Sequence, residues 1–223
     1  MADLILLARP NPVRGLCYEK AEESINYLTS ALITQGFRVG LPHRDGAVPA
    51  IVRNRMVADG IKLKAKWVLF IDTDMVVPSN LGEKLLEHDK DIVAALAVLK
   101  VPPFEPVAYK RHIGEYKHIE NLPENELVEV DAVGFGAVLI KMSVFENLKK
   151  PYFANPAWGE ITMGEDIYFC KHAKEAGFSI YLDTSVQTGH VGDYVYTYQD
   201  YLIHNEKRKP KSNLILPKGM LVN

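Results

Sequence analysis

The chain has 223 residues, of which 48% are hydrophobic and 24% are charged, which is typical of a globular protein with one α/β domain. Its formal net charge of −2 excludes a strongly basic protein, so we expect no nucleic-acid partner. Cys17 and Cys170 are too few for a disulfide framework and too far apart in sequence for a zinc knuckle. They favour a reducing compartment, and we expect a cytoplasmic protein.

The first apolar run, Leu4–Ala8, predicts a buried strand that enters a Pro-rich loop at residues 9–12. The run is too short for a signal-peptide core or a membrane span. We therefore expect no transmembrane segment, and contact with a membrane surface stays open. Apolar residues at helical spacing predict a helix over Glu19–Thr34, which ends at Gly36. A second strand is expected over residues 37–41.

The next segments continue the alternation of strands and helices. A helix is predicted around residues 51–61, and the strongest strand of the chain is Trp67–Ile71. A short helix over residues 81–86 and an apolar strand over residues 92–99 follow. Strands that are apolar on both faces and alternate with helices predict an α/β fold. Its central sheet is expected to be mixed, mostly parallel and flanked by helices.

The second half of the chain is less regular. Its expected elements are strands over Leu127–Val130 and residues 137–140, a helix over residues 166–176 and a last strand over residues 179–182. Residues 101–104 and 120–126 are interpreted as excursions from the core. A Tyr-rich and then basic tail, residues 194–223, is expected to pack on the core as a helix, with a partner or a lid over a site as alternatives.

Two aspartates, Asp72 and Asp74, directly follow the strongest strand. Ligands of open α/β sheets bind outside the carboxyl ends of the strands, and residues i and i+2 of extended backbone project to the same side. Paired carboxylates are tolerated when a divalent cation lies beside them, and oxygen ligands suit Mg²⁺ or Mn²⁺. An ordinary strand-end turn and a phosphatase nucleophile of the haloacid-dehalogenase type are the alternatives, although that nucleophile usually follows the first strand of its core.

Two later features add candidate site residues. Glu165 and Asp166 open a predicted helix, where acidic residues also serve as ordinary caps. His190 lies between Gly189 and Gly192, and glycines allow close backbone approach. A lone histidine is usually structural, but a neutral imidazole is also a common metal ligand and favours Mn²⁺ over Mg²⁺.

This order of features resembles GT-A glycosyltransferases, especially the family 2-like enzymes. Four spans carry the resemblance, namely residues 50–55, 70–75, 134–140 and 164–170. The resemblance implies a GT-A-like, Rossmann-like fold in which residues 1–193 form one catalytic domain. Residues 1–100 would bind the nucleotide, residues 101–193 would bind the acceptor, and residues 194–223 would form the C-terminal tail.

The resemblance also implies a role for each candidate residue in a metal-dependent glycosyltransferase that moves a sugar from a nucleotide-diphosphate sugar to an acceptor hydroxyl. Asp166 would be the catalytic base of an inverting enzyme, with Glu165 shaping the acceptor site. Asp74, Asp72 less directly, and His190 would hold Mn²⁺ or Mg²⁺. The donor nucleotide would contact a larger set: Ala8, Arg9, Pro10, Asp45, Arg53, Asp72, Thr73 and Asp74.

The sequence departs from the commonest family 2 pattern in two respects. Only Arg44, Asp45 and Gly46 stand where many family 2 enzymes have a longer acidic signature, and the Gln-x-x-Arg-Trp motif of processive synthases is missing. These departures argue against a processive synthase and leave the recognition of the donor base open. A nucleotidyltransferase, a phosphatase of the haloacid-dehalogenase type and a non-catalytic module that binds nucleotide sugars are the alternative functions.

Three aromatic residues, Phe135, Tyr152 and Trp158, are candidates for stacking on sugar faces. Packing in the core is the alternative for each of them.

Overall fold

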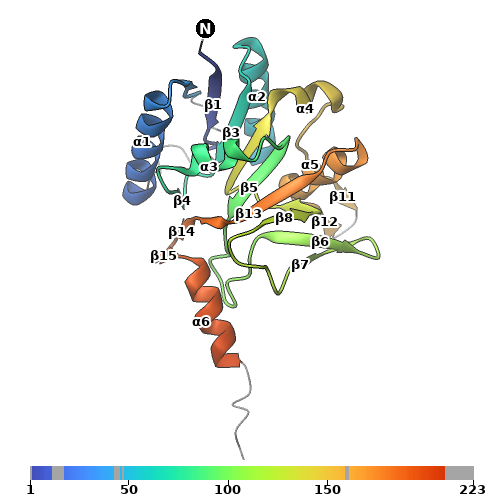
Figure 1. The fold of residues 1–223 in the computed structure, drawn as a ribbon. Coiled ribbons are helices and arrows are strands. Elements are labelled where there is room, and N and C mark those ends of the chain that lie inside the picture. The colour runs from blue at the N-terminus through green and yellow to red at the C-terminus, as the bar shows by residue number, and fades with distance from the viewer. Residues whose placement is uncertain (1, 12–17, 43–45, 47, 159–160, 209–223) are drawn as a thin grey trace, which may run out of the picture.

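The computed structural model of the chain describes residues 2–11, 18–42, 46, 48–158 and 161–208. A seven-stranded sheet with the order β2-β1-β3-β10-β5-β13-β8 forms its centre (Figure 1). Its strands are β1 (Leu4–Ala8), β2 (Arg38–Gly40), β3 (Trp67–Ile71), β5 (Ile92–Leu96), β8 (Leu127–Val130), β10 (Ala137–Lys141) and β13 (Ile180–Gln187).

The directions of the strands confirm a mixed sheet. Strand β1 is parallel to β2 and β3, and β13 is parallel to β5. Strand β10 lies antiparallel between β3 and β5, and β8 is antiparallel to β13 at the edge. Strands β2, β1, β3, β5 and β13 therefore point the same way, and their carboxyl ends share one edge of the sheet.

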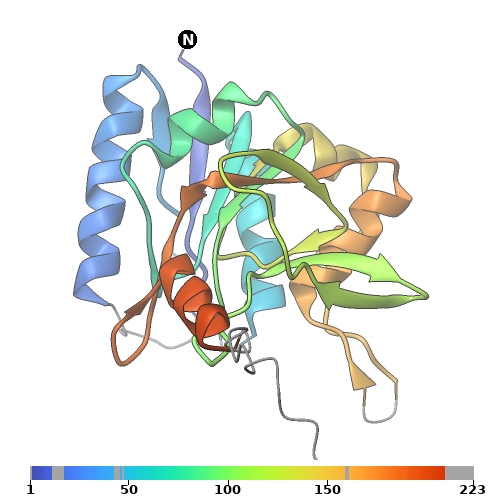
Figure 2. The same cartoon turned by 60° about the horizontal axis from the view of Figure 1, so that its bottom comes forward.

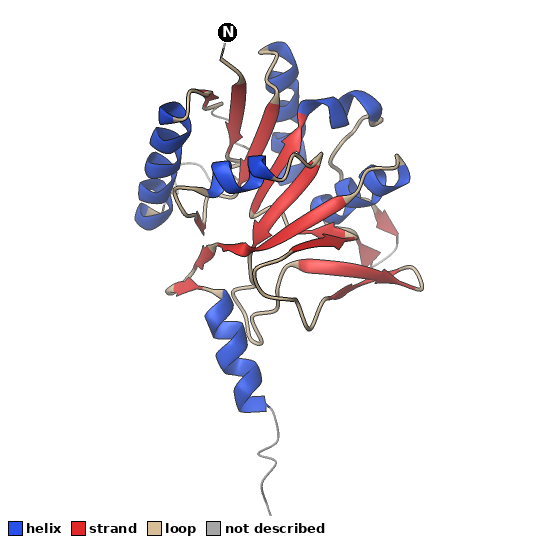
Figure 3. Cartoon of the chain, in the orientation of Figure 1, coloured by secondary structure: helices blue, strands red, loops and turns tan. Residues whose placement is uncertain are grey.

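Helices cover both faces of this sheet (Figure 3). Helices α1 and α3 pack on the face that carries Ile5, Leu7 and Leu69. Helices α2, α4 and α5 pack on the other face, which carries Leu6 and Phe70. The alternation of side chains along each strand produces these two cores. The helices are α1 (Glu19–Thr34), α2 (Pro49–Lys62), α3 (Leu81–Glu87), α4 (Met142–Asn147), α5 (Glu165–Glu175) and α6 (Tyr198–Arg208).

The longest helix follows from its apolar stripe. Ala21, Ile25, Leu28 and Leu32 recur on the buried face of α1, as expected for a helix that covers a sheet. Its end coincides with Gly36, whose φ of 90° lies in the left-handed region that glycine adopts without strain.

Short strands that the sequence did not predict form three small sheets beside the main one. The sheet β15-β14-β4 joins the segment after Asp74 to the segment around His190. The other two lie in the second half of the chain. Their bounds are β4 (Met75–Val76), β14 (Gly189–Val191), β15 (Val195–Tyr196), β6 (Ala108–His112), β7 (Glu115–His118), β9 (Ala132–Val133), β11 (Ala157–Trp158) and β12 (Ile161–Thr162). The strand ending near Leu182 is thus not the last one.

The start of the tail packs on the core as a helix. Tyr198 and Tyr201 of α6 are buried in the core, and the Tyr201 hydroxyl donates a hydrogen bond to the carbonyl of Glu120. Viewed from below, α6 lies beside the carboxyl edge of the sheet (Figure 2). None of the helices in the described part of the chain has the length and apolarity needed to cross a membrane.

Candidate functional site

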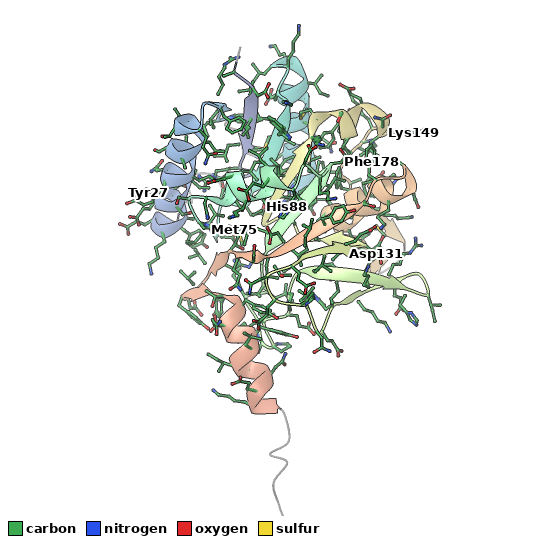
Figure 4. All side chains as sticks on the ribbon, in the orientation of Figure 1. Tyr27, Met75, His88, Asp131, Lys149 and Phe178 are labelled. Atoms are coloured by element: carbon green, nitrogen blue, oxygen red, sulfur yellow. The ribbon has the colours of Figure 1, made fainter. Side chains whose placement is uncertain are left out.

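The Asp72-Thr73-Asp74 motif forms a turn at the carboxyl end of β3. The Asp72 amide donates to the Gly136 carbonyl at 3.2 Å, and the Met75 amide donates back to the Asp72 carbonyl at 3.1 Å. Met75, labelled in Figure 4, is buried and begins β4. The turn interrupts the extended backbone between Asp72 and Asp74. The carboxylates of these two residues contact different side chains.

The first carboxylate, Asp72, is held by a buried arginine. Arg53 of α2 has only 3% of its side chain exposed, and its Nη2 lies 2.6 Å from Asp72 Oδ1. Its Nη1 pairs with Glu165 Oε1, and its guanidinium lies 5.2 Å from the centre of the Phe135 ring. A buried guanidinium needs such charge compensation. Arg53 therefore joins the end of β3 to the start of α5, and its predicted contact with the donor nucleotide stays a prediction.

The charge state of Asp72 reflects opposing influences. Burial raises the pKa of the Asp72 carboxyl, and the Arg53 guanidinium opposes that rise. The neighbouring carboxylates of Asp74 and Glu165 raise the pKa further. Asp72 is therefore the carboxyl of this motif that is harder to ionise, and Arg53 is the group that favours its charged form.

The second carboxylate, Asp74, faces a histidine and a lysine. Strand β14 pairs with β4, with His190 opposite Met75, and the Val191 amide donates to the Asp74 carbonyl at 2.7 Å. This pairing places His190 Nε2 3.2 Å from Asp74 Oδ2, and Lys100 Nζ lies 2.6 Å from the same oxygen. Burial alone would raise the pKa of Asp74, but hydrogen bonds from His190 and Lys100 lower it to about 2. Asp74 is therefore ionised at neutral pH.

The hydrogen bonds of His190 show which of its ring nitrogens could bind a metal ion beside Asp74. His190 Nδ1 lies 2.9 Å from the Val98 carbonyl, which can only accept, so Nδ1 carries a proton. In the neutral ring with its proton on Nδ1, Nε2 carries the lone pair, and a metal ion bound there would replace the present hydrogen bond from His190 to Asp74 Oδ2. A carbonyl that fixes the outer nitrogen of an imidazole is the usual arrangement behind a metal-binding histidine. Asp74 and His190 therefore fit a divalent cation as two of its ligands.

The third predicted ligand, Asp72, is engaged by Arg53. Within the described ranges, no group of three His, Cys, Asp or Glu side chains is arranged to hold a metal ion. Mg²⁺ and Mn²⁺ commonly use one or two protein ligands and complete their shells with phosphate oxygens and water. A cation held by Asp74 and His190 would need such oxygens.

Asp166 lies in the first turn of α5, directly after Glu165. Burial raises the pKa of the Asp166 carboxyl to about 6, although the amide of Ile167 donates to its Oδ1 at 2.7 Å and lowers the pKa. The backbone leaves little room beside it, because a Cβ on Gly164 would lie 2.6 Å from Asp166 Oδ1. Asp166 is thus a partly buried carboxyl that changes charge just below neutral pH.

The Glu165 carboxylate contacts two side chains. One carboxylate oxygen pairs with Arg53 and the other lies 3.3 Å from Asn155 Nδ2. Glu165 therefore anchors Arg53, and a role in shaping the acceptor site stays a prediction.

A cavity of about 160 Å³ lies at the motif. Seven residues line it: Pro10, Pro49, Arg53, Asp72, Thr73, Asp74 and Glu165. Ala8 is buried in β1 beside Phe70, and Arg9 pairs with Glu22 of α1 at 2.7 Å. The Arg9 guanidinium is thus bound to α1, whereas Pro10 joins the cavity. Asp45 lies outside the described residues.

Two of the aromatic candidates belong to the core. Phe135 is 2% exposed and contacts Phe70, Phe153 and Phe169, and Tyr152 is 6% exposed and packs on Phe145. The prediction that these two rings stack on sugars is therefore wrong, because the apolar cluster beneath the motif buries them. The side chain of Trp158 lies outside the described residues.

Sequence reasoning missed Lys100, which contacts Asp74. Its position carried a signal, because Lys100 directly follows the apolar run of residues 92–99 and so lies at the same edge of the sheet as Asp74. A larger cavity of about 660 Å³ lies between α6 and the segment around residues 118–124. None of the predicted site residues lines it.

Comparisons with known proteins define the fold. No family model and no curated protein matches the chain. The structure is similar to that of A197 from STIV, with a TM-score of 0.58 and 20% identity over 86% of this chain and 87% of that one. It is also similar to the catalytic domain of Drosophila β1,4-galactosyltransferase 7 in complex with xylobiose, with a TM-score of 0.52 and 16% identity over 86% of this chain and 71% of that one.

A structure of GalNAc-T7 with UDP, GalNAc and Mn²⁺ matches at a TM-score of 0.48 and 13% identity, over 92% of this chain and 41% of that one. The matches with A197 and with the galactosyltransferase catalytic domain confirm the fold prediction, and the chain has a GT-A-like fold.

Proposed function

We propose that this protein is a metal-dependent glycosyltransferase that moves a sugar from a nucleotide-diphosphate sugar to an acceptor hydroxyl. One observation carries the proposal. Arg53, Asp72, Asp74, Glu165 and His190 come from distant parts of the chain and meet at the carboxyl edge of the sheet, where open α/β folds bind their ligands.

The cavity at the motif is the proposed site of the donor diphosphate. It is lined by Thr73, by Arg53 and by the carboxylates of Asp72, Asp74 and Glu165. Because Arg53 is already paired with two of these carboxylates, an anionic diphosphate would need a divalent cation beside it. We propose that Asp74 and His190 hold a divalent cation there, with Asp72 contributing less directly. When bound, such a cation stabilises the negative charge that develops on the leaving diphosphate, by several kcal/mol.

The acceptor hydroxyl must lose its proton during the transfer. In our proposal an Asp166 carboxylate oxygen takes that proton while the acceptor oxygen forms a bond to the anomeric carbon and the bond from that carbon to the diphosphate breaks. Its pKa of about 6 suits a general base at neutral pH, and such a base typically contributes about 10²- to 10⁴-fold. Arg53 keeps Glu165, the neighbour of this base, fixed.

The proposal is tested first by binding. Thermal-shift measurements with nucleoside diphosphates and their sugar derivatives, with and without Mn²⁺, should give a stabilisation that depends on both the base and the metal. The Asp166→Asn variant should keep that shift and lose sugar transfer. Loss of the shift in a folded Asp166→Asn protein would contradict its assignment as the base.

The same assays separate the alternatives. A haloacid-dehalogenase-type phosphatase would hydrolyse an aryl phosphate and lose that activity in Asp72→Asn. A nucleotidyltransferase would form a nucleotide sugar from a nucleoside triphosphate and a sugar phosphate. A non-catalytic module would show the thermal shift without transfer or slow donor hydrolysis. The low cysteine content supports the further proposal that the protein works in the cytoplasm.

A further inference from the structure

The ammonium group of Lys100 lies at the place where a cation on Asp74 would be expected. Lys100 Nζ donates to Asp74 Oδ2 at 2.6 Å and to the Val191 carbonyl at 3.2 Å. The same carboxylate oxygen lies 3.2 Å from His190 Nε2. One oxygen of Asp74 therefore faces both the lysine and the imidazole.

The surrounding backbone accommodates this lysine. Gly192 lies against its stem, because a Cβ at this position would come 3.3 Å from Lys100 Cδ and 2.9 Å from the ring of Tyr196. The Lys100 side chain is 35% exposed, and its four-carbon stem is flexible. The ammonium can therefore leave Asp74 without any change in the fold.

We propose that Lys100 occupies the cation position of Asp74 while the site is free of nucleotide, and that it moves to the donor diphosphate when a divalent cation binds. This inference rests on the proposed function, because it assumes that a diphosphate binds beside Asp74. It makes Lys100 a positioning residue that couples the binding of the metal to the binding of the donor.

The charges explain why the two cations exclude each other. A divalent ion bound between Asp74 and His190 would meet the ammonium of Lys100 at the same oxygen. In a partly buried site, two cations that face the same carboxylate oxygen repel each other and weaken each other's binding. A diphosphate that arrives with the metal supplies new anionic oxygens, and lysine is a common ligand for phosphate. Metal and diphosphate should therefore bind more tightly together than separately.

The test compares Mn²⁺ binding in Lys100→Met and in the wild type, without any nucleotide. Free Mn²⁺ is measured by electron paramagnetic resonance. We expect Lys100→Met to bind Mn²⁺ about tenfold more tightly than the wild type, because a repelling charge is removed. In the presence of Mn²⁺, the same variant should bind inorganic pyrophosphate about tenfold more weakly by calorimetry, because one phosphate contact is lost. Pyrophosphate serves as the probe because it carries no base or sugar.

Three further variants make the outcome specific. Lys141→Met removes a lysine that pairs with Asp89 away from the site, and it should leave both affinities unchanged. Lys100→Arg should keep the weak Mn²⁺ binding, and adding Asp74→Asn to Lys100→Met should abolish the tight Mn²⁺ binding.

An unchanged Mn²⁺ affinity or an unchanged pyrophosphate affinity in a folded Lys100→Met protein would overturn the inference. The proposed function fails by a different result, namely a wild-type protein that binds no sugar nucleotide.

Discussion

His190 and Asp74 lie 116 positions apart in the chain, yet their side chains face each other across 3.2 Å. The pairing of β14 with β4 brings them together, so main-chain hydrogen bonds fix the position of the imidazole. We expect Asp74→Asn to lower Mn²⁺-dependent donor hydrolysis or transfer by at least about 10²-fold, because it removes the anionic ligand of a catalytic cation.

Steady-state rates with Mn²⁺ present give the measurement for Asp74→Asn. The matched control is Asp183→Asn, since Asp183 also bonds a histidine, His88, but lies outside the cavity at the motif. Near-wild-type turnover in Asp74→Asn would remove Asp74 from the mechanism.

The pH dependence of transfer should report Asp166. A general base works only when ionised, and the pKa of Asp166 is raised to about 6, so kcat/KM should rise with pH and level off above about pH 7. Asp166→Glu should keep part of the activity and a comparable profile, whereas Asp166→Asn should lose both. A rate that stays constant between about pH 5 and pH 7 would assign the proton transfer to another group.

The same carboxyl should also affect stability. The pKa of Asp166 in the folded protein, about 6, exceeds the ordinary aspartate value of 3.8, so the folded protein holds this proton more tightly than the unfolded chain does. The associated stability is present below about pH 4 and is lost as the pH rises through about 6. We therefore expect Asp166→Asn to be more stable than the wild type at neutral pH, by about 2 kcal/mol or less.

Urea unfolding at two pH values tests this expectation for Asp166→Asn. Asp166→Asn should raise the free energy of unfolding near neutral pH. This gain should vanish near pH 4, where the Asp166 carboxyl of the folded wild type is protonated and is as uncharged as the amide of the variant. A gain of equal size at both pH values would point to a change in packing instead of the charge.

Arg53 should be needed for the fold as well as for the site. Arg53→Met leaves the carboxylates of Asp72 and Glu165 without their shared partner, and breaking a buried pair of this kind costs about 3–5 kcal/mol. Chemical unfolding gives the measurement. Lys84→Ala is the control, because its pair with Glu87 is exposed on both sides and should contribute about 1 kcal/mol or less. Equal losses of unfolding free energy in Arg53→Met and Lys84→Ala would show that the ion pairs of Arg53 do not stabilise the fold more than an exposed pair does.

The long apolar elements could be predicted from the sequence because each buries a continuous or periodic set of side chains. Leu4–Ala8, Trp67–Ile71 and Leu127–Val130 match β1, β3 and β8, and Glu19–Thr34 matches α1. Strands β6 and β7 were missed because most of their side chains are exposed and they pair mainly with each other. Strand β14 was missed because it is too short to show a pattern and depends on β4 for its partner.

The site could be predicted only in part. Asp72 and Asp74 follow a strong strand, and Asp166 opens a helix, so their local patterns made them candidates. The pairing of Arg53 with Glu165 crosses 112 positions and depends on how α2 and α5 pack on one face of the sheet. Lys100 has no motif of its own, and its contact with Asp74 arises because β5 and β3 end at the same edge.

The small sheet β4-β14-β15 also limits which insertions and deletions the segment around His190 can accept. Side chains along a strand alternate between faces, so a slip of one residue turns each side chain over. A slip of β14 against β4 would place Gly189 or Val191 at the position of His190, and neither has a side-chain donor or acceptor. Single-residue insertions or deletions close to His190 on β14 should therefore remove the imidazole from Asp74 even when the protein still folds.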